Sequence, residues 1–348
     1  MPIFVSALTT LVLAVYILTR AENRRKLSRI PFGFFLIIWA VLSLTAGLIH
    51  KNIIGDGAFI IYISFIIFSI YAFTAMTKEL CRRIIQLSSV LGIAAFLVAL
   101  VQFIVDPVDR SVSTFFNANY YGFICEIIIL VSFYALLSFR NWRIFYLVSI
   151  AVNIGGLLLS GCRSAWLAVF GGAIVIMICF KEYRKLLVVF VSGVACTGVI
   201  MLFPQIIPRF GSMDTTESLR FQIWQTAFNG FLKHPFIGQG FMSYWIISYG
   251  MGRADQPHAH NILLNALDSY GAVGVILLLI FIVPAVIACV KKLKIRPVCA
   301  LVLGVITAII IHGITDDPIL GMQTGIFGMV ILALGGAKSE QELRSTQT

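Results

Sequence analysis

One polar stretch, Pro204–Gly274, interrupts an otherwise apolar sequence and holds three of the five histidines. Two of these, His258 and His260, are candidate proton-transfer groups because an imidazole titrates near neutral pH and accepts a proton from a hydroxyl. The alternatives are a structural cap on the following helix or a metal-binding pair. H-x-H is a weak metal pattern when no H-E-x-x-H or cysteine cluster accompanies it. We therefore expect a general base or a group that orients an acceptor.

Arginines form a second candidate set. Arg209, Arg220 and Arg253 lie in the same stretch, where no run of carboxylates is present to neutralise them. Guanidinium groups bind phosphate oxygens in a fork, so this set indicates a phosphate or pyrophosphate ligand. Arg163 follows Gly161 and Cys162 and should begin a helix, where a cation is unfavourable unless an anion lies beside it. The alternatives are solvated loop arginines and, for Arg163, a side chain that reaches the membrane interface.

Asparagines and aspartates complete the candidate site. Asn117 and Asn119 could bind sugar hydroxyls or cap a helix, and we expect Asn119 to be the cap. Asn261, Asn265 and Asp268 are spaced to share one helix face, and we expect Asn261 and Asp268 to contact substrate.

A further pair of aspartates, Asp316 and Asp317, precedes Pro318. We expect a solvated turn there, with partnership to an arginine as the second choice.

The composition indicates a membrane protein. The 348 residues are 59% hydrophobic and 12% charged, with a mean hydropathy of +0.97. Repeated long apolar runs are typical of spanning helices, and the seven cysteines lie in or beside them without metal spacing. We expect an all-α, polytopic transmembrane bundle of about 11 spans. These are 2–19, which we interpret as a retained helix and not a signal peptide, 30–49, 57–76, 84–105, 120–138, 144–161, 164–180, 186–204, 262–290, 298–315 and 318–336.

Charge placement predicts the orientation. Most of the 26 Lys and Arg residues lie in alternate connectors, which the positive-inside rule puts in the cytoplasm. The N-terminus is then outside and the C-terminus cytoplasmic, and all five histidines face outward. The net charge of +11 therefore reflects membrane topology and not nucleic-acid binding.

We treat 1–348 as a single membrane domain with an extracytoplasmic loop, 205–258, between spans 8 and 9. Glu217–Leu232 in this loop has the pattern of an amphipathic helix, capped by Thr215 or Thr216 and ended by Pro235. Arg220 and Trp224 share one side of it, so the helix should direct Arg220 toward the body of the protein.

Over about 110–335 the chain resembles the bacterial O-antigen ligase and O-antigen polymerase family of integral-membrane glycosyltransferases. The matching residues, in order, are Phe116, Asn117, Ala118 and Asn119; Gly161, Cys162, Arg163, Ser164, Ala165 and Trp166; Arg220 and Trp224; Pro235, Gly238 and Gly240; and His258, His260, Asn261, Asp268, Gly271 and Gly274. The departures are Cys162 and Ser164 around the arginine, Asp268 in place of glutamate, and eleven spans in place of twelve.

The resemblance implies a GT-C-like fold and a metal-independent enzyme with no cofactor. The implied donor is a glycan on undecaprenyl pyrophosphate at the outer face of the bacterial cytoplasmic membrane, and the acceptor is a sugar hydroxyl on a glycan or lipid. By analogy, Arg163 and Arg220 bind the departing pyrophosphate, and His260, with His258, activates the hydroxyl. The sequence leaves open the sugar, the acceptor, the oligomeric state, and the choice between ligase, polymerase and protein glycosylation.

Two other functions compete with this one. A transporter or flippase of an anionic lipid or solute should place charged groups near the bilayer midplane, often in paired halves, whereas the polar residues here gather at one face. A peptidoglycan polymerase of the shape and division type should need an outer aspartate and not H-x-H-N. Both alternatives therefore rank below glycan transfer.

Overall fold

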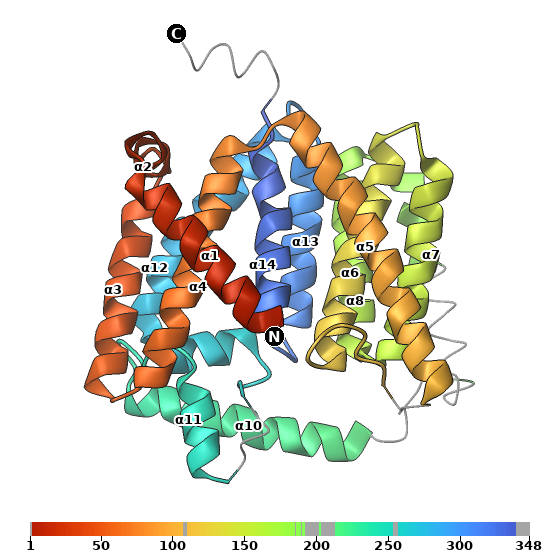
Figure 1. The fold of residues 1–348 in the computed structure, drawn as a ribbon. Helices are drawn as coiled ribbons and strands as arrows, with labels where there is room; N and C mark the ends of the chain where they lie inside the picture. The colour runs from red at the N-terminus through yellow and green to blue at the C-terminus, as the bar shows by residue number, and fades with distance from the viewer. Residues whose placement is uncertain are drawn as a thin grey trace. The chain divides into compact units, whose positions relative to one another are not determined.

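The structure is a computed structural model that describes residues 2–106, 110–184, 186–188, 190, 191, 202, 213–252 and 257–338. Every regular element in these residues is a helix (Figure 1), which confirms the all-α prediction. The helices are α1 (Pro2–Thr19), α2 (Ala21–Ser28), α3 (Gly33–Ile49), α4 (Ile53–Ala75), α5 (Lys78–Val105), α6 (Ala118–Ser138), α7 (Arg143–Ser160), α8 (Arg163–Phe180), α10 (Met213–Lys233), α11 (Ser243–Gly250), α12 (Ile262–Lys292), α13 (Val298–His312), α14 (Met322–Ala333) and the short 3-10 helix η3 (Leu334–Gly336).

Six of the described helices are long and apolar enough to cross a membrane, namely α4, α5, α6, α7, α8 and α12. The bent pair α2 and α3, which turns by 100°, makes a seventh if it counts as one span. Eleven spans were expected from the sequence. The expected spans all fall on helices except 186–204, most of which lies outside the described residues. The apolar segments of α1, α13 and α14 are shorter than the 18 residues required of a candidate span. The count of eleven spans therefore stays a prediction.

The chain forms two compact units. The first comprises residues 1–74, 216–288 and 313–329, and the second comprises 75–215, 289–312 and 330–348. Each unit is assembled from segments that lie far apart in the sequence.

In the second unit, α6 is the central helix, and it packs against α5, α7, α8 and α13. Helices α8 and α13 approach closely where Gly172 faces Gly304. A Cβ atom added to either glycine would lie 2.8 Å from the carbonyl oxygen of the other. Small residues of this kind let membrane helices pack backbone to backbone, so the α8–α13 pairing depends on these two glycines.

In the first unit, α10 and α11 lie at one end of α3, α4 and α12 (Figure 1). The apolar core of the helices joins Trp39 of α3, Phe59 of α4 and Leu277 of α12 to Phe241. A second cluster at α10 and α11 contains Ile223, Ala227, Tyr244 and Ala259, with Trp224 and Leu264 against it. The expected helix in the loop is confirmed, but it begins at Met213, so Thr215 and Thr216 lie inside it and the expected cap is wrong.

Helix α12 is interrupted at Gly271, whose φ of 64° and ψ of −177° are not helical. The turn between α10 and α11 fits into this break. Ala272 and Val273 donate their backbone N–H groups to the carbonyls of Pro235 and Phe236, at 2.8 and 3.0 Å. A φ of this sign suits glycine, and a Cβ at Gly271 would also meet the backbone of Phe236. The P-x-x-G-x-G turn is thus fixed to α12 by backbone pairing.

Candidate active site

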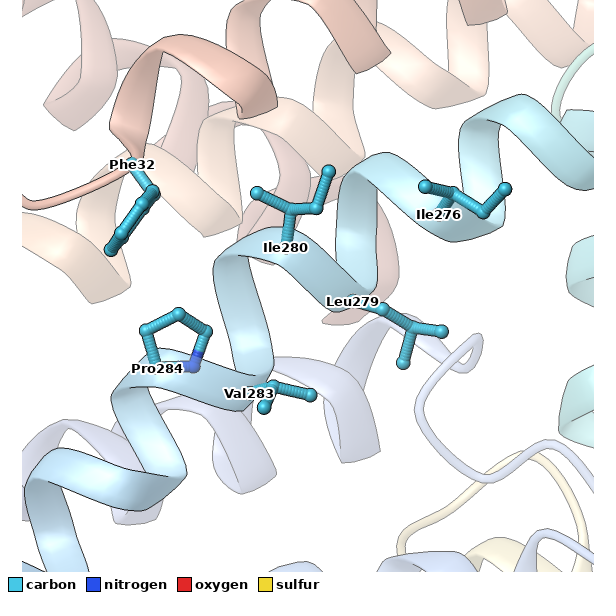
Figure 2. A pocket seen from close by; sticks show the side chains of 6 residues that line it. All are labelled: Phe32, Ile276, Leu279, Ile280, Val283 and Pro284. Atoms are coloured by element: carbon cyan, nitrogen blue, oxygen red, sulfur yellow. The ribbon is translucent and has the colours of Figure 1, made fainter.

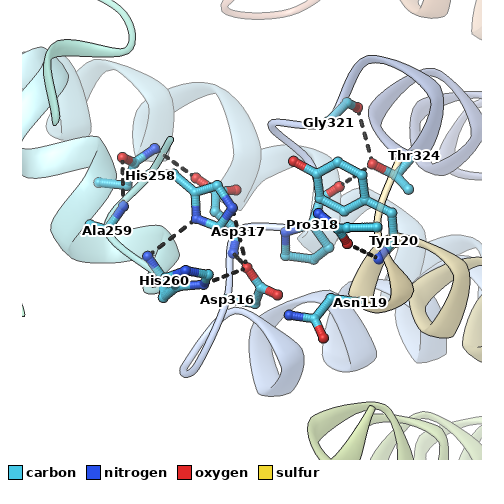
Figure 3. A network of polar contacts seen from close by, with 12 residues as sticks. Asn119, Tyr120, His258, Ala259, His260, Asp316, Asp317, Pro318, Gly321 and Thr324 are labelled. Carbon is cyan, nitrogen blue, oxygen red and sulfur yellow. Dashed lines mark hydrogen bonds and ion pairs between the residues drawn. The ribbon is translucent and has the colours of Figure 1, made fainter. Parts of the chain in front are cut away.

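Two histidines and one aspartate meet in the first unit (Figure 3). His260 places its Nδ1 atom 3.2 Å from Oδ1 of Asp316, and His258 places its Nε2 atom 3.5 Å from the same oxygen. The two imidazole ring centroids lie 4.4 Å apart. The histidines precede α12, and Asp316 lies in the turn between α13 and α14. Two separate connections therefore build this group, which we call the His–Asp cluster.

His258 is held in one tautomer by its surroundings. Its Nδ1 atom accepts a hydrogen bond from the backbone N–H of His260 at 3.2 Å, so the neutral ring carries its proton on Nε2, facing Asp316. The side chain is buried, and burial is the main cause that lowers the pKa of His258 to about 4, with Asp316 opposing and His260 adding to the shift. His258 is therefore neutral at pH 7 and directs its protonated Nε2 atom toward Asp316.

His260 has the geometry of an oriented base. When Nδ1 carries the proton and donates a hydrogen bond to Asp316, the lone pair is on Nε2. The side chain is 25% exposed, so it is partly open to solvent. Its backbone is left-handed, with a φ of 46°, a conformation uncommon outside glycine. The indole N–H of Trp224 donates to the His260 carbonyl at 3.1 Å. Such strain persists where surrounding contacts enforce it.

Asp316 receives several donors on one oxygen. The backbone N–H of Asp317 donates to Oδ1 at 2.8 Å, in addition to the two imidazoles. These donors favour negative charge on that oxygen. Asp316 is 2% and Asp317 6% exposed, so the expectation of a solvated turn is wrong. The turn is buried against the segment that carries the histidines.

Asn265 of α12 connects the two sides of the cluster. Its Nδ2 atom donates to Oδ2 of Asp317 at 2.8 Å, and its Oδ1 atom accepts the backbone N–H of Ala259 at 3.4 Å. Burial raises the pKa of Asp317 to about 7, although the hydrogen bond from Asn265 opposes the shift. Asn265 therefore fixes the aspartate turn relative to the histidine segment.

The same three side chains could in principle hold a metal ion, because their ligand atoms lie within 4.8 Å of one another. The hydrogen bond into Nδ1 of His258 argues against this. A neutral imidazole ligates a metal only through an unprotonated nitrogen, and in His258 that nitrogen already accepts a hydrogen bond while Nε2 keeps its proton. The arrangement therefore suits proton transfer better than metal binding.

Asn261 and Asp268, expected to contact substrate, are engaged within the protein. Asn261 accepts the N–H of Leu264 at 2.9 Å and donates to the carbonyl of Ile314 at 3.0 Å. Asp268 is fully buried, and its carboxylate accepts hydrogen bonds from Gln239 at 3.0 Å and Ser243 at 2.6 Å. Both residues therefore have structural contacts, and their substrate role stays a prediction.

The remaining predicted residues divide between the units. Arg220 lies on α10 in the first unit, whereas Asn117 and Arg163 lie in the second. Arg209 and Arg253 lie outside the described residues. Arg163 is the first residue of α8, as the sequence predicts.

The capping expectation at α6 is wrong. Asn117 is the cap, and its side chain accepts the N–H of Tyr120 at 2.8 Å. Asn119 instead accepts a hydrogen bond from the guanidinium of Arg110. The loop needs an extended residue before the helix, and Asn117 is that residue, with a φ of −147°. The substrate role expected of Asn117 stays a prediction.

An apolar groove of about 410 Å³ lies along α12 (Figure 2). Phe32, Ile276, Leu279, Ile280, Val283 and Pro284 line it. None of these lining side chains is titratable, so the groove offers no group for acid–base chemistry.

Residues 148–279 match the model of a known protein family, described as O-antigen ligase. The matched region runs from α7 into α12 and includes Arg163, Arg220, His258 and His260. It confirms, over these residues, the resemblance stated from the sequence. No curated protein matches the chain.

Proposed function

We propose that this protein transfers a glycan from an undecaprenyl-pyrophosphate carrier to a sugar hydroxyl at the outer face of the bacterial cytoplasmic membrane. Two findings support the proposal. The O-antigen ligase family model matches residues 148–279, and the histidines of that region meet Asp316 in a geometry suited to proton transfer. The observation that carries it is the 3.2 Å contact between Nδ1 of His260 and Asp316.

The reaction needs one base and one anion site. His260 accepts the hydroxyl proton on Nε2 as the acceptor oxygen attacks the anomeric carbon of the donor sugar. The bond between that carbon and the pyrophosphate oxygen breaks, and the pyrophosphate leaves with its electron pair. Asp316 stabilises the imidazolium that forms, as the aspartate does in hydrolase triads. All atoms are accounted for without a metal or cofactor.

Arginines supply the anion site in this proposal. Arg163 and Arg220 bind the pyrophosphate and neutralise the charge that grows as it leaves, and Arg209 and Arg253 add positive charge nearby. Arg163 is well suited because it begins α8, where the helix dipole favours an anion at the N–H groups. The guanidinium and the helix N-terminus then share one diphosphate. Asn117, Asn261 and Asp268 contact sugar hydroxyls or hold the residues that do.

We also propose which face of the membrane carries the His–Asp cluster. Eleven spans, with the N-terminus outside and the C-terminus in the cytoplasm, put the His–Asp cluster at the outer face. The connectors rich in Lys and Arg support this orientation. The donor must then reach the outer leaflet before transfer.

The test is transfer by the purified full-length chain in lipid nanodiscs, with one defined glycan on undecaprenyl pyrophosphate and alternative acceptors. We expect a new glycosidic product on a gel, as a ladder for a polymerase or a single addition for a ligase. Donor movement across a liposome bilayer without a glycosidic product would support the transporter and overturn the proposal.

A further inference from the structure

A second buried pair of ionisable groups lies in the second unit, between helices α6 and α13. His312, the last residue of α13, places its Nδ1 atom 2.6 Å from Oε2 of Glu126 on α6. Both side chains are 0% exposed. The other oxygen, Oε1 of Glu126, is buried and has no hydrogen-bond partner among the described residues. Ionisable groups inside a membrane protein are costly and usually serve function.

The pair continues to the start of α8. Nε2 of His312 lies 3.8 Å from Sγ of Cys162, and that sulfur lies 3.5 Å from Oγ of Ser164. Cys162 is the N-cap of α8, yet its side chain makes no capping hydrogen bond. The thiol points instead to the imidazole. A polar chain therefore runs from α6 through the end of α13 to the first turn of α8.

These buried polar contacts cost folding stability, and their position suggests why they are kept. A carboxylate buried in the protein interior, with one oxygen unsatisfied, lowers stability compared with an apolar residue of the same size. An apolar residue would also pack α6 against α13. The chain instead fixes Cys162, and the next residue is Arg163.

We propose that Glu126 and His312 are positioning residues that hold the first turn of α8, so that Arg163 binds the pyrophosphate of the lipid donor. This inference rests on the proposed function. Glu126 and His312 do not touch the ligand. They act through Cys162, and their loss should weaken pyrophosphate binding only while Arg163 is present.

The test is a double-mutant cycle on ligand affinity. The probe is undecaprenyl pyrophosphate without sugar, titrated into the full-length chain in nanodiscs, with undecaprenyl phosphate as the comparison ligand. A lost charge-assisted hydrogen bond weakens binding by about tenfold or more. We expect Arg163→Gln to weaken pyrophosphate binding by at least about tenfold, and Glu126→Gln to weaken it by a similar factor. In the Arg163→Gln background, Glu126→Gln should add less than about twofold.

Ser132→Ala is the matched control. Ser132 also lies on α6, is fully buried, and contacts the hydroxyls of Ser89 at 3.0 Å and Ser149 at 2.9 Å. It should lower the unfolding temperature and leave the affinity unchanged. If Glu126→Gln does not fold, Cys162→Ala removes the thiol at the other end of the Glu126–His312–Cys162 contacts with little change in volume. Its effect on affinity should depend on Arg163 in the same way.

The outcomes separate the two proposals. Equal weakening by Glu126→Gln with and without Arg163, or no weakening in either Glu126→Gln or Cys162→Ala, overturns the positioning role and leaves the proposed function standing. Unchanged affinity in Arg163→Gln removes Arg163 from the pyrophosphate site of the proposed function, and the positioning role is lost with it.

Discussion

The imidazole of His260 lies 3.2 Å from the carboxylate of Asp316, although the two residues are 56 positions apart in the chain. This distance sets the tautomer of the ring. Asp316 draws the proton to Nδ1 and leaves the lone pair on Nε2, on the partly exposed side chain. The arrangement turns an ordinary histidine into an oriented base.

The first prediction concerns that contact. Asp316→Asn keeps the shape of the side chain but removes the charge that stabilises imidazolium. We expect kcat for glycan transfer to fall by about 10²-fold or more, with the unfolding temperature lowered by only a few degrees. Initial rates and thermal unfolding of the purified variant measure both effects. Asp106→Asn changes an exposed carboxylate at the end of α5 and should leave the rate unchanged; equal rates in the two variants would remove Asp316 from the mechanism.

The second prediction concerns acid stability. The pKa of His258 is about 4 in the folded protein, below the ordinary value of 6.5. The unfolded chain therefore binds more protons between these values, and folding stability falls as the pH drops from 6.5 toward 4. We expect a loss on the order of 1–3 kcal/mol from this residue.

His258→Gln should reduce that acid sensitivity. Unfolding in denaturant, followed at several pH values between 4 and 7.5, measures it. The gap between the wild-type and variant stabilities should be largest near neutral pH and shrink toward pH 4. A gap that is constant across the range would show that His258 is not buried as a neutral ring.

The third prediction concerns Trp224. Trp224→Phe keeps an aromatic ring but removes the N–H that donates to the His260 carbonyl. We expect a stability loss of about 1 kcal/mol and a reduced transfer rate, because the left-handed conformation of His260 loses a support. Trp142→Phe is the control, since Trp142 is 64% exposed. A wild-type rate in Trp224→Phe would mean that the backbone of His260 needs no such support.

The fourth prediction concerns metals. Because Nδ1 of His258 accepts a backbone hydrogen bond, the cluster should transfer protons without an ion. Transfer activity should be unchanged after dialysis against a chelator, measured with a chelator-treated donor. Loss of activity that added Zn²⁺ or Mn²⁺ restores would contradict the tautomer assigned to His258.

Helical periodicity and apolar length were enough to predict most of the helices, including the one that contains Arg220 and Trp224, but not α2 or α11. They were also enough to single out His258 and His260, because H-x-H-N follows a polar stretch and precedes an apolar one. Asp316 was assigned to a solvated turn because a D-D-P sequence after a span has the composition of an exposed turn. Only the packing of that turn against the histidine segment shows otherwise.

The other missed residues have the same cause. Glu126 sits in an unbroken apolar run, and nothing local indicates that His312, far along the chain, is its partner. Asn117 and Asn119 are two residues apart with similar capping propensity, and only the structure shows that Asn117 caps α6 while Asn119 pairs with Arg110. Contacts between residues that are distant in sequence are set by tertiary packing, and local sequence patterns do not predict that packing. A signal was available for Glu126, since a carboxylate inside a span needs a partner.

The most direct measurement compares wild-type protein with His260→Gln in the reconstituted transfer reaction, using a defined glycan on undecaprenyl pyrophosphate. Glutamine keeps a polar side chain of similar length but accepts no proton at neutral pH. We expect that transfer falls by about 10²-fold or more, while the affinity for undecaprenyl pyrophosphate stays within about twofold of wild type. Transfer at the wild-type rate by His260→Gln would contradict this expectation.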